Sequence, residues 1–364
     1  GLMIGRFAYG AIVRAPKAAL VPAVAFMTVI GTFAIRNSIS DVAIMIVLGV
    51  IGWLASKRGF SASPIVLGLI LGRIAEQGGL VDLAAYEAAE GYQAARQALT
   101  GMTPAEVREL VKEANLRGRG GAGFSTGMKW SFVPMGDKCS PGHKYLVCNA
   151  DETEPGTFKD RLLMECDPHQ LIEGMILAAY TIQADRSYIF IRGEYVVAIE
   201  RLEQALADCY KKGYLGENIL GSGYDLEMHV HTSAGRYICG EETALINALE
   251  GKRANPRAKP PFPQVSGLWG RPTIVNNVET LCNISHIIDK GPEWFQSLGI
   301  GEDAGTKLYG ASGHVKTPGC WELPIGTPVR EILENHAGGM ADGRKLKGFL
   351  PGGGSTDFLV EEHL

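Results

Sequence analysis

The stretch Lys144–Asp160, KYLVCNADETEPGTFKD, decides the fold of this 364-residue chain. Its first part, Lys144 to Cys148, is a short, largely apolar run that indicates a buried strand. The acidic loop Asn149–Asp160 follows it directly. Because α/β sheets present their ligand loops at the carboxyl ends of the strands, we expect a binding loop at this position.

Helix-like and strand-like segments alternate on both sides of this strand. The clearest helix begins at Thr103, where Thr103 suits the N-cap, Pro104 the first turn and Glu106 the third helical position. We expect helices over residues 103–114, 169–180, 197–211 and 242–249, and further strands over residues 187–192 and 226–231. This alternation predicts an α/β domain over residues 79–304.

The sequence changes character after residue 304. Two strand-like runs flank Lys316–Gly319, and a helix-like run covers Val329–Asn335. The pattern predicts a small, separate β-grasp-like domain over residues 305–350. Residues 351–364 are interpreted as the start of a C-terminal region that is cut short.

Residues 1–78 are much more apolar than the rest of the chain. Ala18–Ile35 is an 18-residue stretch without a charge, the minimum length that suggests a bilayer-spanning helix. Val42–Ala55 and Pro64–Leu71 are shorter apolar runs. This part of the sequence therefore predicts an apolar, transmembrane α-helical segment, with a buried soluble helix as the alternative.

Charge and cysteine content exclude several classes of function. The formal net charge is −4 and no Lys/Arg-rich run occurs, which argues against a nucleic-acid partner. Seven cysteines are scattered along the chain without a CxxC pair. That spacing supplies no ligand set for zinc or an iron–sulfur cluster, so we expect no metal in this chain.

A glycine-rich stretch after the helix at 103–114 is the first candidate binding segment. It carries the pattern G-x-G-x-x-G in Gly118, Gly120 and Gly123, with a further glycine, Gly121, between the last two. A helix precedes it, so an ordinary Rossmann motif, which needs a strand there, is excluded. Glycines still let backbone N–H groups approach a phosphate or a flat ring, and Arg119 and Lys129 add positive charge. A flexible linker is the alternative.

Two acidic segments are the next candidates. Asp151, Glu152 and Glu154 offer acceptors for ribityl, ribose or carboxamide groups, with a solvated acidic turn as the alternative. Glu241 and Glu242 start a predicted helix, where capping and the helix dipole explain acidic residues equally well.

Aromatic and amide side chains complete the candidate site. Lys259 begins a proline-rich turn that holds Phe262 rigidly, and Phe124, Phe132 and Phe262 can stack on an adenine. Burial in the core is the alternative for each ring. The segment Val275–Thr280 supplies the amides of Asn276 and Asn277 for a polar ring edge, with N-capping as the alternative.

Taken together, these motifs resemble one family. The segments are GRGGAGFSTGMKW (118–130), NADETEPGTFKDRLLME (149–165), FIRGEY (190–195), GRYICGEETALINALEGKRANPRAKPPFP (235–263) and RPTIVNNVETLCN (271–283). They are similar, in the same order, to the flavoprotein subunit of bacterial complex I (NADH-quinone oxidoreductase), which corresponds to the 51 kDa subunit in mitochondria. The resemblance runs from about residue 80 to residue 364.

The resemblance implies cofactors and site residues. It implies FMN held by Gly118, Gly120, Lys129, Asn149, Asp151, Tyr237, Gly240, Glu241, Asn276, Asn277 and Thr280. It implies NADH stacked against Phe124, Phe132 and Phe262, with Lys129, Glu154 and Glu242 near its polar parts. Hydride would pass directly from NADH to FMN, so no residue is expected to act as a general acid or base.

The resemblance also implies partners and a location. Electrons would pass to iron–sulfur subunits of the 24 kDa and 75 kDa types, at the cytoplasmic face of the bacterial inner membrane. The family also carries a [4Fe–4S] cluster, whose ligands are absent from this sequence. A diaphorase subunit of an NAD-linked hydrogenase or formate dehydrogenase shares the same flavin motifs and is the alternative.

The apolar segment resembles a different family. Residues 33–72 (FAIRNSISDVAIMIVLGVIGWLASKRGFSASPIVLGLILG) are similar to the C-terminal end of the large membrane subunit of tripartite tricarboxylate transporters. The likeness covers about residues 1–77. We interpret the chain as a joined or truncated gene model, such as a misassembly between two unrelated genes, with a genuine membrane-tethered fusion as the alternative.

Overall fold

The computed structural model describes residues 68–136 and 142–364. The described residues fall within one compact unit, Leu67–Leu364. Residues 1–67 of the predicted membrane segment lie outside the described residues. Within the described residues, no helix combines the length and apolar character needed to cross a bilayer.

A four-stranded parallel sheet organises the α/β part, with the order β3-β2-β1-β4. Its strands are β1 (Tyr145–Ala150), β2 (Arg186–Arg192), β3 (Glu227–Ser233) and β4 (Thr273–Asn277). The predicted α/β fold is therefore confirmed, and the three expected strands lie within two residues of their predicted starts. β4 was not among the expected strands, because Ile274 and Val275 are its only apolar residues and its end at Asn276–Asn277 is polar.

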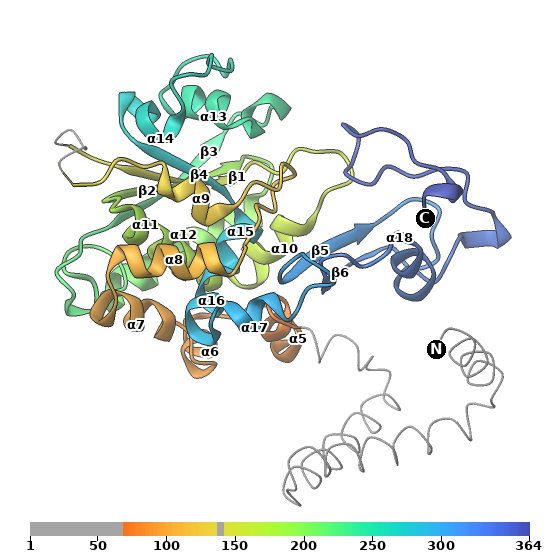
Figure 1. Cartoon of the computed structure of the whole chain (residues 1–364), viewed down its shortest axis with the longest axis horizontal. Coiled ribbons are helices and arrows are strands. Elements are labelled where there is room, and N and C mark those ends of the chain that lie inside the picture. Colours follow the sequence, from red (N-terminus) through yellow and green to blue (C-terminus); the bar gives the residue numbers. More distant parts are fainter. Residues whose placement is uncertain (1–67, 137–141) are drawn as a thin grey trace, which may run out of the picture. The chain divides into compact units, whose positions relative to one another are not determined.

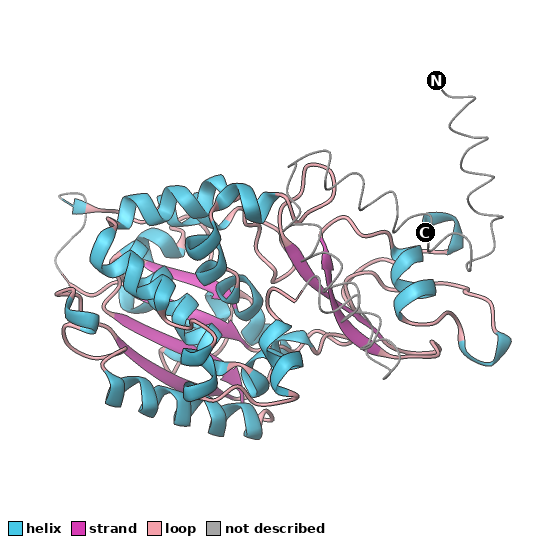
Figure 2. Ribbon diagram, turned by 90° about the horizontal axis from the view of Figure 1, so that it is seen from below, coloured by secondary structure: helices cyan, strands magenta, loops and turns pink. Residues whose placement is uncertain are grey.

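Helices cover both faces of this sheet (Figures 1 and 2). In chain order they are α5 (Gly72–Gln77), α6 (Leu83–Ala88), α7 (Gln93–Gly101), α8 (Pro104–Glu113), α9 (Thr126–Ser131), α10 (Lys159–Cys166), α11 (Pro168–Ile182), α12 (Val196–Lys212), α13 (Glu242–Leu249), α14 (Pro263–Ser266), α15 (Val278–Cys282), α16 (Ile284–Lys290) and α17 (Pro292–Gln296). The capping box predicted before α8 is present, because Thr103 and Glu106 exchange side-chain to backbone hydrogen bonds.

Alternate residues of β1 face two different cores. Leu146 and Cys148 belong to the larger core, which α11 and α15 complete. Val147 belongs to a smaller core on the other face, together with Leu245 of α13. This period of two follows from the pleat of a strand that is covered on both sides.

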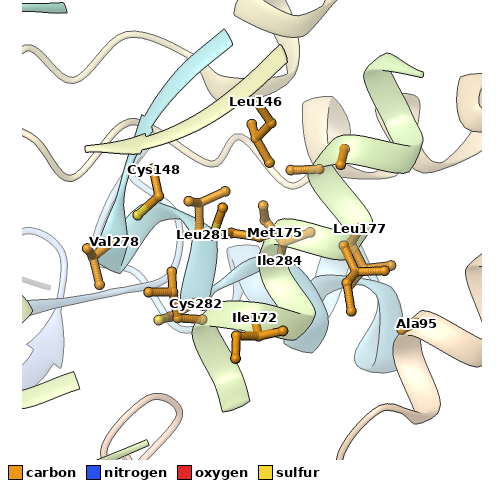
Figure 3. Close-up of a cluster of buried hydrophobic side chains, with 14 of the residues drawn as sticks. Ala95, Leu146, Cys148, Ile172, Met175, Leu177, Val278, Leu281, Cys282 and Ile284 are labelled. Atoms are coloured by element: carbon orange, nitrogen blue, oxygen red, sulfur yellow. The ribbon is translucent and has the colours of Figure 1, made fainter. Parts of the chain in front are cut away.

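Helix α11 lies at the centre of the larger core (Figure 3). Ile172 and Met175 of α11 are buried, as are Leu281 of α15 and Ile284 of α16. Gly174 lets α11 approach α15 closely, because a Cβ atom at this position would lie 2.0 Å from the carbonyl oxygen of Leu281. The close approach fixes α15, and with it the end of β4.

A two-stranded antiparallel sheet follows the α/β part. It consists of β5 (Thr306–Ala311) and β6 (Gly319–Pro324), and the helical segments α18 (Val329–Glu331) and Ile332–His336 come after it. The two expected strands and the expected helical run are therefore present. The backbone N–H of Leu308 donates to Glu279 at 2.8 Å, which connects β5 with α15.

The residues just before α5 also connect with β6. Ile70 is fully buried in the larger core, and the N–H groups of Ile70 and Leu71 donate to the Glu322 carboxylate at 2.9 and 3.0 Å. Residues 70–77 therefore pack as part of the α/β unit, and its boundary with the apolar segment lies near residue 67.

Candidate functional site

Loops from distant parts of the chain meet at the carboxyl ends of β1 and β4. These ends are side by side, because Asn149 pairs with Asn277 in the sheet. Asn149 Nδ2 donates to the carbonyl oxygen of Gly240 at 2.9 Å. Gly120 lies against Asn277, since a Cβ atom at Gly120 would be 3.2 Å from Asn277 Cβ. The glycine-rich stretch, the acidic loop, the start of α13 and the end of β4 thus form one cluster.

Lys129, Glu242 and Lys259 form a charged group at this cluster. Lys129 Nζ lies 2.9 Å from Glu242 Oε2 and donates to the carbonyl oxygen of Val275, also at 2.9 Å. Lys259 Nζ lies 2.6 Å from Glu242 Oε1. Burial raises the pKa of Glu242, but the two ammonium groups outweigh burial and hold that pKa below its ordinary value. Glu242 therefore stays ionised between two lysines, and capping alone does not explain it.

Asp151 leaves an acceptor without a partner. Its side chain is buried, and Ser233 Oγ donates to Asp151 Oδ1 at 2.7 Å. Asp151 Oδ2 is buried without a hydrogen-bond partner among the described residues. Burial raises the pKa of Asp151, although Ser233 and Arg192 act in the opposite direction. A buried orphan acceptor is energetically unfavourable, and a ligand hydroxyl or N–H group would satisfy it.

The glycine-rich stretch presents its backbone. Gly121 and Gly123 have φ angles of +118° and +66°, which side chains rarely adopt, and a Cβ atom at either would meet nothing within 4 Å. The N–H groups from Gly120 to Gly123 donate no hydrogen bond within the part of the chain that the structure describes. Gly118 instead donates to the carbonyl oxygen of Phe124 at 2.9 Å, which closes the loop before α9. These features suit close approach by a phosphate or a ring.

Four aromatic side chains near these loops are exposed. Phe124, Phe132, Phe262 and Tyr237 have 53%, 52%, 53% and 55% of their surface exposed. The ring centroids of Phe124 and Phe132 lie 6.3 Å apart. Core packing, the alternative for the three phenylalanines, is therefore wrong, and half-exposed rings are available for stacking on a ligand.

Several predicted site side chains are committed to structural contacts, and these predictions need correction. The Arg119 guanidinium is buried and donates to the carbonyl oxygens of Ala304 and Thr306, so its charge does not serve a phosphate. Only its backbone N–H faces the cluster, where it donates to Thr280 Oγ1 at 2.8 Å. Glu152 accepts the N–H groups of residues 159–161 at the start of α10. Its carboxylate therefore caps that helix.

The capping alternative is also correct for two residues. Glu241 accepts the N–H groups of Thr243 and Ala244 at 2.9 Å and so caps α13. Asn277 accepts the N–H of Glu279 at 3.0 Å and caps α15. Asn276 is held differently, because Trp130 Nε1 donates to its side-chain oxygen at 2.9 Å.

The sequence reasoning missed a buried ionic cluster beneath Asn277. Lys159 Nζ lies 2.7 Å from Asp160 and 2.7 Å from Glu279. Burial lowers the pKa of Lys159, but the two carboxylates outweigh it and raise that pKa. Asp160 in turn accepts Asn277 Nδ2 at 2.7 Å, so the cluster orients this amide. Lys159 and Asp160 lie inside the motif at residues 149–165, but the spacing of that motif does not indicate that the two charged side chains are buried.

The described residues contain no group of three or more His, Cys, Asp or Glu side chains arranged to hold a metal ion. The six cysteines in the described ranges are free thiols, and four of them are buried in the core. These residues therefore do not fit a [4Fe–4S] cluster.

Comparisons with protein families match three parts of the chain. Residues 111–286 match the Nuo51 FMN-binding domain, and residues 311–358 match the SLBB domain. Residues 1–67 match the tripartite tricarboxylate transporter TctA family. The two resemblances inferred from sequence motifs are thus confirmed.

Curated relatives match about three quarters of the chain. The NADH-quinone oxidoreductase F subunits of Salmonella typhimurium (strain LT2) and Escherichia coli (strain K12) are each 61% identical over 279 residues, or 77% of this chain and 62% of the relative. The corresponding F 2 subunit of Rhizobium meliloti (strain 1021) is 58% identical over 282 residues, 78% of this chain and 66% of the relative. The chain thus spans just over three fifths of the length of the first two relatives.

Solved structures support the same fold. An NAD+-reducing [NiFe]-hydrogenase in the air-oxidized state is 38% identical with a TM-score of 0.64, over 75% of this chain and 44% of the hydrogenase chain. The H2-reduced state gives 37% identity and a TM-score of 0.65, over 76% and 45% of the two chains.

Proposed function

We propose that this chain, from about residue 80 onward, belongs to the family of the NADH-quinone oxidoreductase flavoprotein subunit, and that it binds FMN and oxidises NADH by hydride transfer to that flavin. The observation that carries the proposal is the cluster of loops at the ends of β1 and β4, in which Asp151 Oδ2 and the N–H groups of Gly120–Gly123 have no partner in the described chain. These are the groups that a polar, phosphate-bearing ring system requires.

The residues present fit FMN. The N–H groups of Gly120–Gly123 and the ammonium of Lys129 would hold its phosphate and ring edge. Asp151 Oδ2 would accept a hydrogen bond from its ribityl chain or ring. Asn276 and Asn277, fixed by Trp130 and Asp160, would supply oriented amides. Glu241 and Glu152 support these loops through the helices that they cap.

The exposed aromatic side chains fit the second ring system. Phe124, Phe132 and Phe262 would stack against the adenine of NADH, and Glu154 and Glu242 would accept hydrogen bonds from its hydroxyl or carboxamide groups. Lys259 holds Glu242 on the side opposite to Lys129. Both lysines keep Glu242 ionised, which makes it a fixed acceptor.

Hydride transfer from NADH to a flavin requires no general acid or base from the protein. When bound, FMN accepts the two electrons of a hydride together and can release them singly. The side chains of this chain bind the two ring systems, orient them face to face and hold their polar edges. No residue is assigned as a general acid or base.

We further propose that the electrons leave through iron–sulfur partner subunits of the 24 kDa and 75 kDa types, at the cytoplasmic face of the inner membrane. The likeness to a chain of an NAD+-reducing hydrogenase favours a second candidate, a diaphorase subunit of such a hydrogenase or of a formate dehydrogenase. The higher identity to the NADH-quinone oxidoreductase relatives supports the first candidate. Copurification from the native host separates them, because the two candidates require different partner subunits.

The domain division is also a proposal. We assign residues 79–304 to the FMN- and NADH-binding domain and residues 305–350 to a β-grasp-like domain, which the SLBB match at residues 311–358 supports. We propose that the apolar segment, predicted as residues 1–78 but ending near residue 67, is a transporter-derived membrane piece joined to an unrelated module.

A titration of the purified full chain with FMN tests the proposed function. We expect saturable quenching of flavin fluorescence with about one FMN per chain. Addition of NADH should then bleach the flavin absorbance in the absence of oxygen. A chain that retains no FMN and binds none on titration would contradict the proposal.

A further inference from the structure

A second glycine-rich loop lies against the candidate site. Residues 351–356 (PGGGST) follow the β5–β6 unit, and the backbone N–H of Ser355 donates to Glu154 Oε1 at 2.7 Å. The N–H of Gly354 donates to the carbonyl oxygen of Pro155 at 3.2 Å. In Figure 1 this blue loop reaches the yellow-green loop that follows β1. Two segments about 200 positions apart thus meet at the acidic loop.

The contact holds both oxygens of one carboxylate. Ser355 N–H donates to Glu154 Oε1, and the Tyr237 hydroxyl donates to Glu154 Oε2 at 2.5 Å. A glutamate on an exposed loop otherwise samples several rotamers, and ordering it loses side-chain entropy. These two donors therefore fix the direction of the carboxylate before any ligand arrives.

Glycine is required where the loop passes Glu154. Gly353 has a φ angle of +87°, and a Cβ atom there would lie 2.6 Å from Glu154 Cγ and 2.7 Å from Glu154 Oε1. The next residue, Gly354, is different. A Cβ atom at Gly354 would make only ordinary contacts, with Pro155 at 3.5 Å and Glu154 Oε1 at 3.7 Å. The structure thus offers two adjacent glycines, of which only the first bears directly on the carboxylate.

We propose that Ser355 and Gly353, which lie in the loop 351–356, position the Glu154 carboxylate to accept a hydrogen bond from a ribose hydroxyl of NADH. This inference rests on the proposed function. An acidic side chain that binds a ribose hydroxyl is a recurrent device of dinucleotide sites. The hydrogen bonds from Tyr237 and Ser355 outweigh slight burial and lower the pKa of Glu154, so the acceptor remains ionised at neutral pH.

The test compares Gly353→Ala with Gly354→Ala in the full chain, with ADP-ribose as the probe. ADP-ribose carries both riboses and the pyrophosphate but cannot be oxidised as NADH is, so calorimetry reports binding alone. We expect Gly353→Ala to weaken ADP-ribose binding about tenfold, the equivalent of losing one charged hydrogen bond. Gly354→Ala should bind as the unchanged chain does. The KM for NADH should rise in the same ratio, with kcat retained.

A double-mutant cycle with Glu154→Gln shows whether the loop acts through this carboxylate. In the Glu154→Gln background, we expect Gly353→Ala to weaken binding less than twofold. A second pair, Ser355→Pro against Ser355→Ala, removes or retains the donating N–H and replaces Gly353→Ala if that variant does not fold.

Equal ADP-ribose affinity in Gly353→Ala and Gly354→Ala would overturn the inference, as would full additivity with Glu154→Gln. In that case NADH would still bleach the flavin of the unchanged chain, and the proposed function would stand. If the unchanged chain bound neither FMN nor ADP-ribose, the proposed function itself would fail, and the inference with it.

Discussion

At the scale of single residues, the candidate site separates into side chains that face a ligand and side chains that build the loops. Lys129, Glu242 and Asp151 belong to the first group, because their charges or free lone pairs lie at the cluster. Arg119 and Glu152 belong to the second, because their charged groups make buried hydrogen bonds with backbone partners. The distinction leads to two predictions.

Replacing Lys129 should impair the reaction and leave the fold intact. In Lys129→Met, Glu242 keeps its partner Lys259, so no carboxylate is left unpaired. We expect the rate constant of flavin reduction divided by the KM for NADH to fall about 10- to 100-fold, as for the loss of a charged hydrogen bond. Stopped-flow bleaching of the flavin measures it. Lys112→Met, which breaks an exposed pair with Glu109 on α8, is the matched control. Equal kinetics in the two variants would refute the assignment.

Replacing Asp151 should stabilise the FMN-free fold and weaken FMN binding. Burial raises the pKa of Asp151, so the folded state holds the proton more tightly than the unfolded state does. Its contribution to stability is therefore full at low pH and is lost as the pH rises through the raised pKa. Asp151→Asn should raise the free energy of unfolding of the FMN-free chain at pH 7, with the gain vanishing below about pH 4, the ordinary range of Asp.

Urea titrations at both pH values, with FMN affinity measured in parallel, check this prediction. FMN affinity should fall in Asp151→Asn, because the acceptor oxygen is replaced or weakened. A variant that is less stable than the unchanged chain at pH 7, yet binds FMN equally well, would show that Asp151 is a structural residue.

The sequence predicts the role of a site residue only where the partner of that residue lies a few positions away in the chain. The exposure of the three phenylalanines and the pairing of Lys129 with Glu242, 113 positions away, required the fold. The capping by Glu241 and Asn277 was an open alternative, because their partners lie two or three residues on. The role of Ser355 had no local signal at all.

At the scale of elements, the site depends on how α11 and α15 pack, since α15 follows β4 directly. Local patterns predicted the capping box at Thr103 and the strands β1–β3. β1 and β2 contain apolar runs, and β3 alternates apolar and polar residues. They failed for β4, because Ile274 and Val275 are its only apolar residues. They also failed for α10, whose start is capped by Glu152 from seven residues away. Two predictions belong to this scale.

Gly174→Ala should destabilise the α/β unit. Its Cβ atom would lie 2.0 Å from the Leu281 carbonyl oxygen, so α11 and α15 would have to move apart. We expect a loss of about 3 kcal/mol in the free energy of unfolding, typical of overpacking in a core. Gly101→Ala is the control, because a Cβ atom at this last residue of α7 would meet nothing within 4 Å. Thermal or urea unfolding of the two variants decides the matter, and equal stability would mean that the close approach of the helices is not needed.

The junction between residues 70–71 and β6 should depend on pH through Glu322. Burial raises the pKa of Glu322 to about 7, although Thr306, Leu71 and Ile70 donate hydrogen bonds to it. Its contribution to stability is therefore present below the ordinary Glu value and is lost as the pH rises through about 7.

The amide that Glu322→Gln introduces cannot ionise, so this variant does not lose this stability as the pH rises. The difference in free energy of unfolding between the variant and the unchanged chain should therefore shift by about 3 kcal/mol in favour of the variant between about pH 4.5 and a pH above about 7. Urea titrations across this range test the prediction. Parallel stability profiles of the two proteins would show that Glu322 titrates normally.

At the scale of the whole molecule, different parts of the chain are similar to different families. The sequence composition was enough to distinguish the apolar segment from the rest of the chain, because the hydropathy of a segment depends only on its own residues. The contacts of β5, β6 and the loop 351–356 with the α/β unit could not be predicted in this way, since they join positions 29 to 252 residues apart. Those contacts make the C-terminal unit part of the candidate site.

The most direct test of the account is an experimental structure of the full chain with FMN and NAD+ bound. The flavin should lie at the carboxyl ends of β1 and β4, with a donor within hydrogen-bond distance of Asp151 Oδ2 and the nicotinamide stacked on the flavin ring. The adenine should contact Phe124, Phe132 or Phe262. A flavin bound elsewhere, or Asp151 Oδ2 still without a partner, would contradict it.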